Sequence, residues 1–274
     1  MALDDTAGSA VARGLRATPR FSIEAAPLAL FQVESGAVAE RKARGAFFTP
    51  RTLCDYVVKW AVRDPADRVL EPSCGEAAFL LSAGTRLHDL GCASPSCGGQ
   101  LHGVELHPES ASVAGQLLGA SGLSAEIDVG SFFDRQPEQR FDAVVGNPPY
   151  VRYHGFSGEA RARSHAAAWR AGVRLSKLAS SWAAFTVHAA QFLKPEGRLG
   201  LVLPAELLSV NYAAEVRRLL MARFARVQLV LFTERVFPGV QEEVVLLLAE
   251  GTGSTDRCEL YQVANATELG SREL

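Results

Sequence analysis

Short apolar runs alternate with stretches of helical periodicity along most of this chain. The apolar runs are rich in Val and Leu, and many end in Gly, Pro or an acid, which is typical of buried strands. They predict strands at 69–72, 101–105, 125–129, 141–146, 197–204, 227–232 and 244–248. Apolar residues at helical spacing predict helices at 28–44, 50–61, 77–90, 108–118, 180–193 and 205–224.

Helices separate most of the strands, so the pattern predicts an α/β fold with a seven-stranded, doubly wound, mostly parallel sheet. No helix separates the last two runs, so the last strand is expected to pair antiparallel. Thr49 is expected to cap the helix that begins at Pro50. Residues 1–35 are expected to form a poorly ordered leader and 36–250 the main domain, with a tail at 251–274.

The fourth apolar run leads into Asn147-Pro148-Pro149-Tyr150. Neither proline can donate a backbone hydrogen bond, so the strand should stop here, with Asn147 extended at its carboxyl end. Ligands of open α/β sheets bind at that edge. An amide oxygen and a proline carbonyl could accept from one exocyclic amino group while the tyrosine ring stacks on a flat heterocycle. The alternative is a Pro-Pro turn that only ends a strand.

Two further predicted strands end in an acid. Glu71 is followed by the tight turn Ser73-Cys74-Gly75 and a helix, so backbone N–H groups of the turn can face a ligand. The turn lacks the G-x-G-x-x-G fingerprint, which disfavours a dinucleotide. Glu105 ends the next strand, where an acid can accept both hydroxyls of a ribose or can cap the following helix.

The composition is that of an ordinary globular protein. The chain has 274 residues, 48% of them hydrophobic and 21% charged, with a net charge of −2 and a pI near 6.3. Charge alone therefore does not indicate a binder of polyanions. Residues 151–177 differ, because they contain six basic residues and one acid, Glu159, which gives a local charge of +5. With Tyr153, His154 and Trp169 interleaved, this segment suits contact with nucleic acid, although a solvated Arg-rich helix would have the same composition.

The cysteine pattern favours a reducing compartment. There are five cysteines, and the amino terminus lacks the order of a secretory signal, so we expect a cytoplasmic protein. No apolar run approaches the length of a membrane span, and no membrane contact is expected. His88, Cys92, Cys97 and His102 have spacings that a zinc site could use, but we expect no metal there. Cys74 is expected to be a small buried residue rather than a nucleophile.

The order of five short segments along the chain is informative. They are Phe47-Phe48-Thr49-Pro50; Glu71 to Leu80; Gly103-Val104-Glu105-Leu106-His107-Pro108; Asn147 to Tyr150; and Phe185 ahead of Phe192-Leu193-Lys194-Pro195-Glu196-Gly197. Together they resemble the gamma-class N6-adenine DNA methyltransferases, the TaqI-like group of class I S-adenosylmethionine-dependent enzymes with an Asn-Pro-Pro-Tyr motif. The resemblance covers about residues 36 to 250.

This resemblance implies a methyl transfer from S-adenosylmethionine to the N6 amino group of an adenine flipped out of DNA. Asn147 and the Pro148 carbonyl would accept from that amino group; Pro149 completes the motif, and Tyr150 and Phe185 would sandwich the base. The implied cofactor residues are Phe47, Thr49, Glu71, Ser73, Cys74, Gly75, Glu105, Leu106, Ser131 and Phe132. It also implies a restriction-modification or similar defence system, with DNA as partner, a separate specificity or target-recognition subunit, and a restriction endonuclease.

The chain departs from the family pattern at three points. Ala77 replaces a glycine, and Ser131 stands where the family commonly has an aspartate for the adenine of the cofactor. Family members usually continue into a target-recognition domain, so 251–274 is expected to be the start of such a region. Two alternatives stay open: an amino-methyltransferase acting on protein glutamine or ribosomal RNA, and a non-catalytic subunit that binds cofactor.

Overall fold

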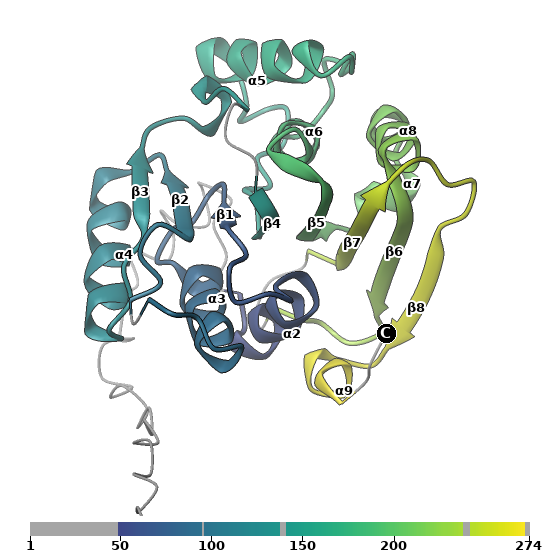
Figure 1. The fold of residues 1–274 in the computed structure, drawn as a ribbon. Helices are drawn as coiled ribbons and strands as arrows, with labels where there is room; N and C mark the ends of the chain where they lie inside the picture. The colour runs from purple at the N-terminus through teal and green to yellow at the C-terminus, as the bar shows by residue number, and fades with distance from the viewer. Residues whose placement is uncertain (1–48, 95, 138–140, 238–241, 272–274) are drawn as a thin grey trace, which may run out of the picture. The chain divides into compact units, whose positions relative to one another are not determined.

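The computed structural model describes residues 49–94, 96–137, 141–237 and 242–271 (Figure 1). The chain divides into two compact units, Met1–Val38 and Ala39–Leu274, and all described residues belong to the second. Phe47, the leader expected at 1–35 and the helix expected at 28–44 lie outside the described residues. Within the described part, no helix has the length and apolar character needed to cross a bilayer.

One eight-stranded sheet forms the centre of this unit, in the order β3-β2-β1-β4-β5-β7-β6-β8 (Figure 1). The strands are β1 (Val69–Glu71), β2 (Leu101–Glu105), β3 (Glu126–Val129), β4 (Phe141–Gly146), β5 (Leu193–Pro204), β6 (Phe224–Phe232), β7 (Val244–Thr252) and β8 (Glu259–Val263). Neighbours pair in parallel, except that β7 is antiparallel to both β5 and β6. The predicted α/β class, the mostly parallel sheet and the antiparallel strand near its end are confirmed.

The predicted count of seven strands was one short, because β8 lies in residues that we expected to be a tail. As an edge strand, β8 pairs only with β6. Its hydrophobic pattern is also reversed: Leu260 is 63% exposed, whereas Glu259 faces Arg226 at 2.8 and 3.0 Å. A half-exposed acid whose partner is a distant arginine gives no strand signal in the sequence.

Helices flank the strands in the order expected of a doubly wound sheet. They are α2 (Arg51–Ala61), α3 (Ala78–Asp89), α4 (Pro108–Ala120), α5 (Gly158–Arg170), α6 (Ser181–Ala190), α7 (Glu206–Ser209), α8 (Ala214–Arg223) and α9 (Ala266–Gly270), with 3-10 turns η2 (Phe132–Asp134) and η3 (Asn211–Ala213). The single helix predicted at 205–224 is wrong, since Val210 is extended between α7 and η3. Arg217 of α8 donates to the freed carbonyl of Leu207 at 2.7 Å, which stabilises the break.

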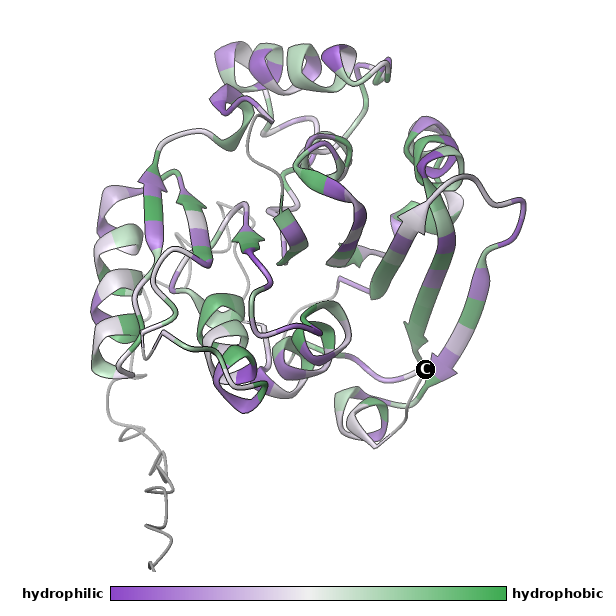
Figure 2. Ribbon diagram, viewed as in Figure 1, coloured by the Kyte–Doolittle hydropathy of each residue, from purple (hydrophilic) through white to green (hydrophobic). Residues whose placement is uncertain are grey.

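The core lies where the helices meet the middle of the sheet. Strands β6 and β7 and the second half of β5 are mostly buried, and hydrophobic residues recur along them (Figure 2). Helix α2 packs on β4, β5 and α3, while α6 packs on β5 and α8. The contact of α2 with β5 is close, because a Cβ on Gly200 would lie 2.6 Å from Cγ1 of Val57.

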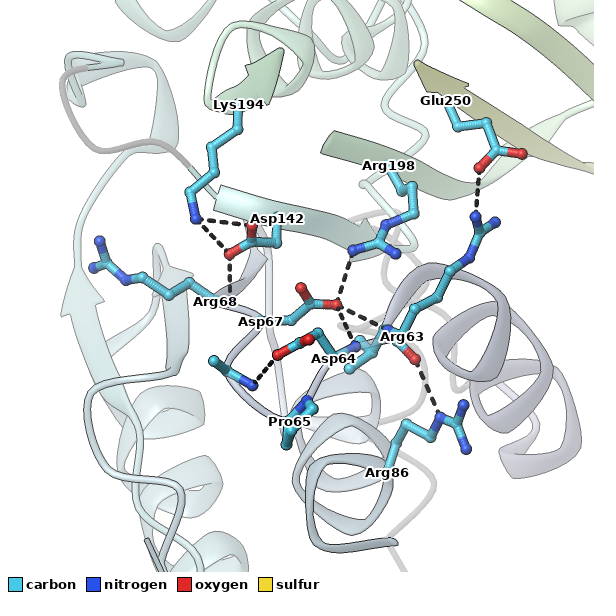
Figure 3. A network of polar contacts seen from close by, with 12 residues as sticks. Arg63, Asp64, Pro65, Asp67, Arg68, Arg86, Asp142, Lys194, Arg198 and Glu250 are labelled. Carbon is cyan, nitrogen blue, oxygen red and sulfur yellow. Dashed lines mark hydrogen bonds and ion pairs between the residues drawn. The ribbon is translucent and has the colours of Figure 1, made fainter. Parts of the chain in front are cut away.

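A polar network ties the amino ends of the central strands together (Figure 3). Arg198 of β5 contacts Asp67, just before β1, at 2.8 Å, and both side chains are mostly buried. Asp67 also accepts from the backbone N–H of Arg63 at 2.8 Å. Nearby, Asp142 of β4 accepts from Lys194 and from the backbone of Arg68, each at 2.8 Å. These contacts fix β1, β4 and β5 at the end of the sheet opposite Asn147.

We predict that Asp67→Ala lowers the free energy of unfolding by about 3 kcal/mol, because it leaves the Arg198 guanidinium buried without its partner. Urea denaturation measures the change. The control is Glu215→Ala, which breaks the exposed pair with Arg218 and should change stability by less than about 1 kcal/mol. Equal effects of the two substitutions would contradict the assigned role of the buried pair.

Candidate active site

The Asn147 segment and the acid of β1 meet at the carboxyl edge of the sheet. Strand β4 ends at Gly146, and a Cβ there would lie 3.6 Å from Cγ of Glu71 and from Cδ of Pro72. Because β1, β2 and β4 are parallel, they bring Glu71, Glu105 and Asn147 to the same edge. The structure thus places all three residues at one edge of the sheet.

Two hydroxyl groups hold the Asn147 amide. Nδ2 lies 3.1 Å from Oγ1 of Thr49, and Oδ1 lies 2.5 Å from the Tyr150 hydroxyl. The Tyr150 hydroxyl is also 2.9 Å from the carbonyl oxygen of Val202. The helix cap predicted at Thr49 is wrong, because Pro50 occupies the N-cap of α2 and the Thr49 hydroxyl binds Asn147 instead.

The Tyr150 hydroxyl has two acceptors within hydrogen-bond distance, Oδ1 of Asn147 and the Val202 carbonyl. A phenol has one proton, and the Val202 carbonyl can only accept it. Strand β4 stops at the level of Leu201, so no β4 residue pairs with Val202 on that side. The 2.5 Å separation from Oδ1 of Asn147 is that of an O–H···O bond and is too short for N–H···O. The Tyr150 hydroxyl therefore shares its proton between Oδ1 and the Val202 carbonyl, and Nδ2 of Asn147 donates to Thr49.

The two proline carbonyls have different surroundings. The Pro149 carbonyl accepts from the Ser181 hydroxyl, which in turn accepts from the Val151 backbone at 2.9 Å. Among the described residues, no hydrogen bond reaches the Pro148 carbonyl. It is therefore left as an acceptor beside Asn147. Sequence reasoning missed Ser181, for which the only signal was a serine pair before a helix.

Glu105 and the Ser73–Gly75 turn form one unit. The carboxylate of Glu105 accepts from the backbone N–H of Gly75 at 2.8 Å and of His107 at 2.9 Å. Each oxygen keeps a lone pair for a further donor. The Ser73 hydroxyl is buried and has no partner among the described residues. These acceptors and this unpaired hydroxyl fit the ribose and methionine ends of S-adenosylmethionine, and the exposed Leu106 stands beside them.

Glu71 lies below this turn in a fully buried position. It accepts from the backbone N–H of Leu80 at 3.1 Å, in the first turn of α3. Burial raises its pKa well above the ordinary value, against the hydrogen bonds of Leu80 and Phe79, and the nearby Glu105 adds to the increase. Burial, together with Glu71 and Glu105, also raises the pKa of the Cys74 thiol. A thiol held neutral is not a nucleophile, as expected.

An aromatic cluster surrounds Phe132, next to Ser131. Phe185 stacks on Phe132 with 5.6 Å between centroids and 18° between planes, and it meets Phe133 edge-on at 4.7 Å. Among the described rings, Phe185 makes no such pair with Tyr150. The structure therefore places Phe185 on the side predicted for the cofactor adenine, and its contact with a target base stays a prediction.

His188 holds the chain segment that carries Ser131 and Phe132. Its Nε2 lies 3.2 Å from the Phe132 carbonyl and 3.1 Å from the Arg135 carbonyl, so the neutral ring donates from Nε2. Burial lowers the pKa of His188 to about 4, against the effect of both carbonyls. Sequence reasoning gave no role to this residue.

The middle of the basic segment 151–177 forms α5, which lies beyond the carboxyl ends of β1, β2 and β3 (Figure 1). Much of its charge is used inside the protein. Arg163 pairs with Asp134 and Glu159, Arg170 donates to the Phe133 carbonyl at 3.2 Å, Arg161 to that of Phe156 at 3.5 Å, and Arg152 contacts Glu242 at 3.4 Å. Arg174 and Lys177 make no ion pair or hydrogen bond in the part of the chain that the structure describes, and Trp169 is 65% exposed. The free positive surface is thus smaller than the composition suggested.

Glu242, just before β7, also borders the site. It contacts Arg152, and it adds to the burial that raises the pKa of Tyr150 well above its ordinary value. Sequence reasoning missed Glu242, because a single acid before a strand carries no signal. By contrast, no cluster of metal-ligating side chains occurs in the described ranges. The Cys92 thiol contacts Gln100 at 2.8 Å, while His102 contacts Gly99 and Glu126.

Comparison with known proteins identifies the family. The family model of N-6 DNA methylases matches residues 31–272. The chain belongs to the N-6 DNA methylase family. It is 29% identical over 205 residues to the type II methyltransferase M.XamI of Xanthomonas campestris pv. amaranthicola, covering 71% of this chain and 37% of that protein. It is 28% identical over 225 residues to M.TthHB8I of Thermus thermophilus, covering 80% and 47%.

Solved structures share the fold of this N-6 DNA methylase chain. A modification subunit of a putative type I restriction enzyme from Vibrio vulnificus matches with a TM-score of 0.67 at 22% identity, over 85% of this chain and 52% of that one. The DrdV–DNA complex matches with a TM-score of 0.66 at 14% identity, over 85% and 29%. The chain spans about 37–47% of the length of the two curated relatives above.

We predict that acid weakens the fold through His188. The unfolded state takes up a proton near pH 6.5 and the folded state only near 4, so the free energy of unfolding falls as pH drops between these values. The loss at pH 4 is about 3 kcal/mol. Chemical denaturation at pH 7 and pH 4 measures it, with His188→Gln, which keeps a donor, as the control. An identical pH dependence in both proteins would contradict the assignment.

Proposed function

We propose that this chain transfers a methyl group from S-adenosylmethionine to the N6 amino group of an adenine extruded from DNA. The observation that carries the proposal is the pair of acceptors at the end of β4: the anchored Asn147 amide and the Pro148 carbonyl, which lacks a partner among the described residues. Membership of the N-6 DNA methylase family supports it.

The residues around Glu105 are proposed to hold the cofactor. Glu105 would accept the ribose hydroxyls, Ser73 and the backbone of Gly75 would face the methionine part, and Phe132 with Ser131 would line the adenine. Thr49 and Phe47 are proposed to close the methionine end, with Glu71 and Cys74 beneath. Bound S-adenosylmethionine supplies an electrophilic methyl group on a sulfonium.

The protein contributes positioning and dipoles. Asn147 and Pro148 accept the two N6 hydrogens of the base, which draws the nitrogen lone pair out of conjugation and directs it. The base must leave the DNA stack for these contacts, and it would stack on the Tyr150 ring in place of its neighbouring bases. Positive charge develops on the nitrogen during the transfer, and the two oxygen dipoles stabilise it.

We further propose a cytoplasmic restriction-modification setting, because the relatives are named type II methyltransferases and one structural neighbour is a modification subunit of a type I enzyme. The partners would be DNA, a specificity or target-recognition subunit and a restriction endonuclease. The exposed Trp169 with Arg174 and Lys177 favours a nucleic acid over a protein glutamine as substrate.

The direct test is transfer of labelled methyl from S-adenosylmethionine to unmethylated genomic DNA, followed by nucleoside analysis. N6-methyladenine is the expected product. Labelled N4-methylcytosine, or label only in RNA or protein, would overturn the proposal. Mapping the modified positions gives the recognition sequence.

We predict that Asn147→Ala and Glu105→Gln separate chemistry from cofactor binding. Asn147→Ala should lower methyl transfer by about a thousandfold, because a transition-state contact is lost, and leave the cofactor Kd within about twofold. Glu105→Gln should weaken the cofactor Kd by about tenfold, because a charged acceptor becomes neutral. Calorimetry and transfer rates measure both. A loss of cofactor affinity in Asn147→Ala as large as that in Glu105→Gln would refute the role assigned to Asn147.

We predict that Thr49→Val lowers kcat by about tenfold, because Asn147 loses one of the two hydroxyls that hold its amide. Thr49→Ser keeps that hydroxyl and should restore most of the rate. The KM for DNA should change little in either variant. A Thr49→Ser rate as low as that of Thr49→Val would show that the methyl group, not the hydroxyl, matters.

A further inference from the structure

An open cavity lies next to the residues that follow Tyr150. Its volume is about 680 Å³, and it is lined by residues that follow β4, residues between α5 and α6, and residues that follow β5. Ser180 lines this cavity, while the adjacent Ser181 binds the Pro149 carbonyl and the Val151 backbone. The cavity and the proposed base site therefore share one wall.

A fixed carboxylate lies in this cavity. Glu206 Oε2 accepts from the Tyr212 hydroxyl at 2.5 Å, and the same hydroxyl lies 3.2 Å from the Trp182 indole nitrogen and 3.1 Å from the Ser180 hydroxyl. Tyr212 gives its single proton to Glu206 and accepts from the other two. Burial and Glu206 raise the pKa of Tyr212 to about 12, so the phenol stays a donor. Glu206 Oε1 has no partner among the described residues and is free to accept.

Another part of the cavity wall is aromatic. The ring centroids of Tyr153 and His154 lie 3.7 Å apart with their planes at 37°, and Tyr153 is 37% exposed. Leu178, which is 59% exposed, and Arg152 also line the cavity. Such a wall suits the face of a heterocycle and a nearby phosphate. The carboxylate of Glu206 disfavours a phosphate deeper in the cavity and favours an exocyclic amino group.

We propose that this cavity holds the nucleotide next to the target adenine in the same DNA strand. Its base stacks on Tyr153, and its exocyclic amino group donates to Glu206. This inference rests on the proposed function, because it takes the strand that presents the target base as the ligand. In this proposal Glu206 determines sequence preference at the nucleotide beside the target adenine, which is not itself methylated.

The test uses the full chain and fluorescence-labelled oligo-dC and oligo-dU of equal length. The two bases differ along one edge: C4 carries an amino group in cytosine and a carbonyl in uracil, and N3 is an acceptor in cytosine and an N–H donor in uracil. We expect oligo-dC to bind about tenfold more tightly than oligo-dU, since only cytosine has the exocyclic amino donor that the proposal places on Glu206. Fluorescence anisotropy gives both Kd values.

Two variants separate the parts of the cavity. Glu206→Gln should bring the two Kd values together, because an amide can pair with either group. Tyr153→Ala should weaken both by about tenfold and keep their ratio, because stacking does not depend on the base. The control Glu215→Gln makes the same charge change on α8, outside the cavity, and should alter neither value. Circular dichroism checks that each variant is folded.

The outcomes of this binding test can be distinguished from those of the methyl-transfer assay. Equal binding of both strands, no binding, or a ratio that Glu206→Gln leaves unchanged overturns the cavity proposal, even if the chain methylates duplex DNA. A ratio that collapses only in Glu206→Gln supports it. If that result occurs in a chain that transfers no methyl to DNA, strand binding stands and the proposed reaction falls.

Discussion

Pro148 and Pro149 have no backbone N–H, and the arrangement of the site depends on this. Because they cannot continue the ladder, β4 stops at Gly146 while β5 runs on to Pro204. The Val202 carbonyl is left beside a loop instead of a strand, and the Tyr150 hydroxyl takes it. That bond holds Tyr150, and Tyr150 holds Asn147. The Asn147 amide is thus held in place because Pro148 and Pro149 lack backbone N–H groups.

The acidic side chains at the two ends of the sheet have different partners. At the amino end, Asp67 and Asp142 are matched by Arg198 and Lys194 and by backbone donors, so charge is neutralised locally. At the carboxyl edge, Glu71 and Glu105 lie close together without a cation bound to either carboxylate in the described residues. Backbone N–H groups of the turn and of α3 are their main partners. Such an edge favours a ligand that brings hydroxyl donors and positive charge.

The sequence was most informative where chemistry depends on residues that are neighbours in the chain. The strand before Asn147, the turn after Glu71 and the acid at the end of β2 were all predicted from local patterns. The contacts that orient them were not, because Thr49 reaches Asn147 across 98 positions and Ser181 reaches Pro149 across 32. β8 was missed for the same reason, since its Glu259 is bound by Arg226, 33 positions away. The arginines of α5 suggested a larger free positive surface than the fold leaves.

The antiparallel placement of β7 has a consequence for how this fold can change. Strand β6 runs parallel to β5, so it ends at the carboxyl edge, and β7 must begin there. The connection between them therefore leaves from and returns to the substrate side. Its Glu242 contacts Arg152 at that side, whereas Val236 and Phe237 are buried in the core. Substrate preference can then diverge at Glu242 while the buried residues of the same connection keep the core intact.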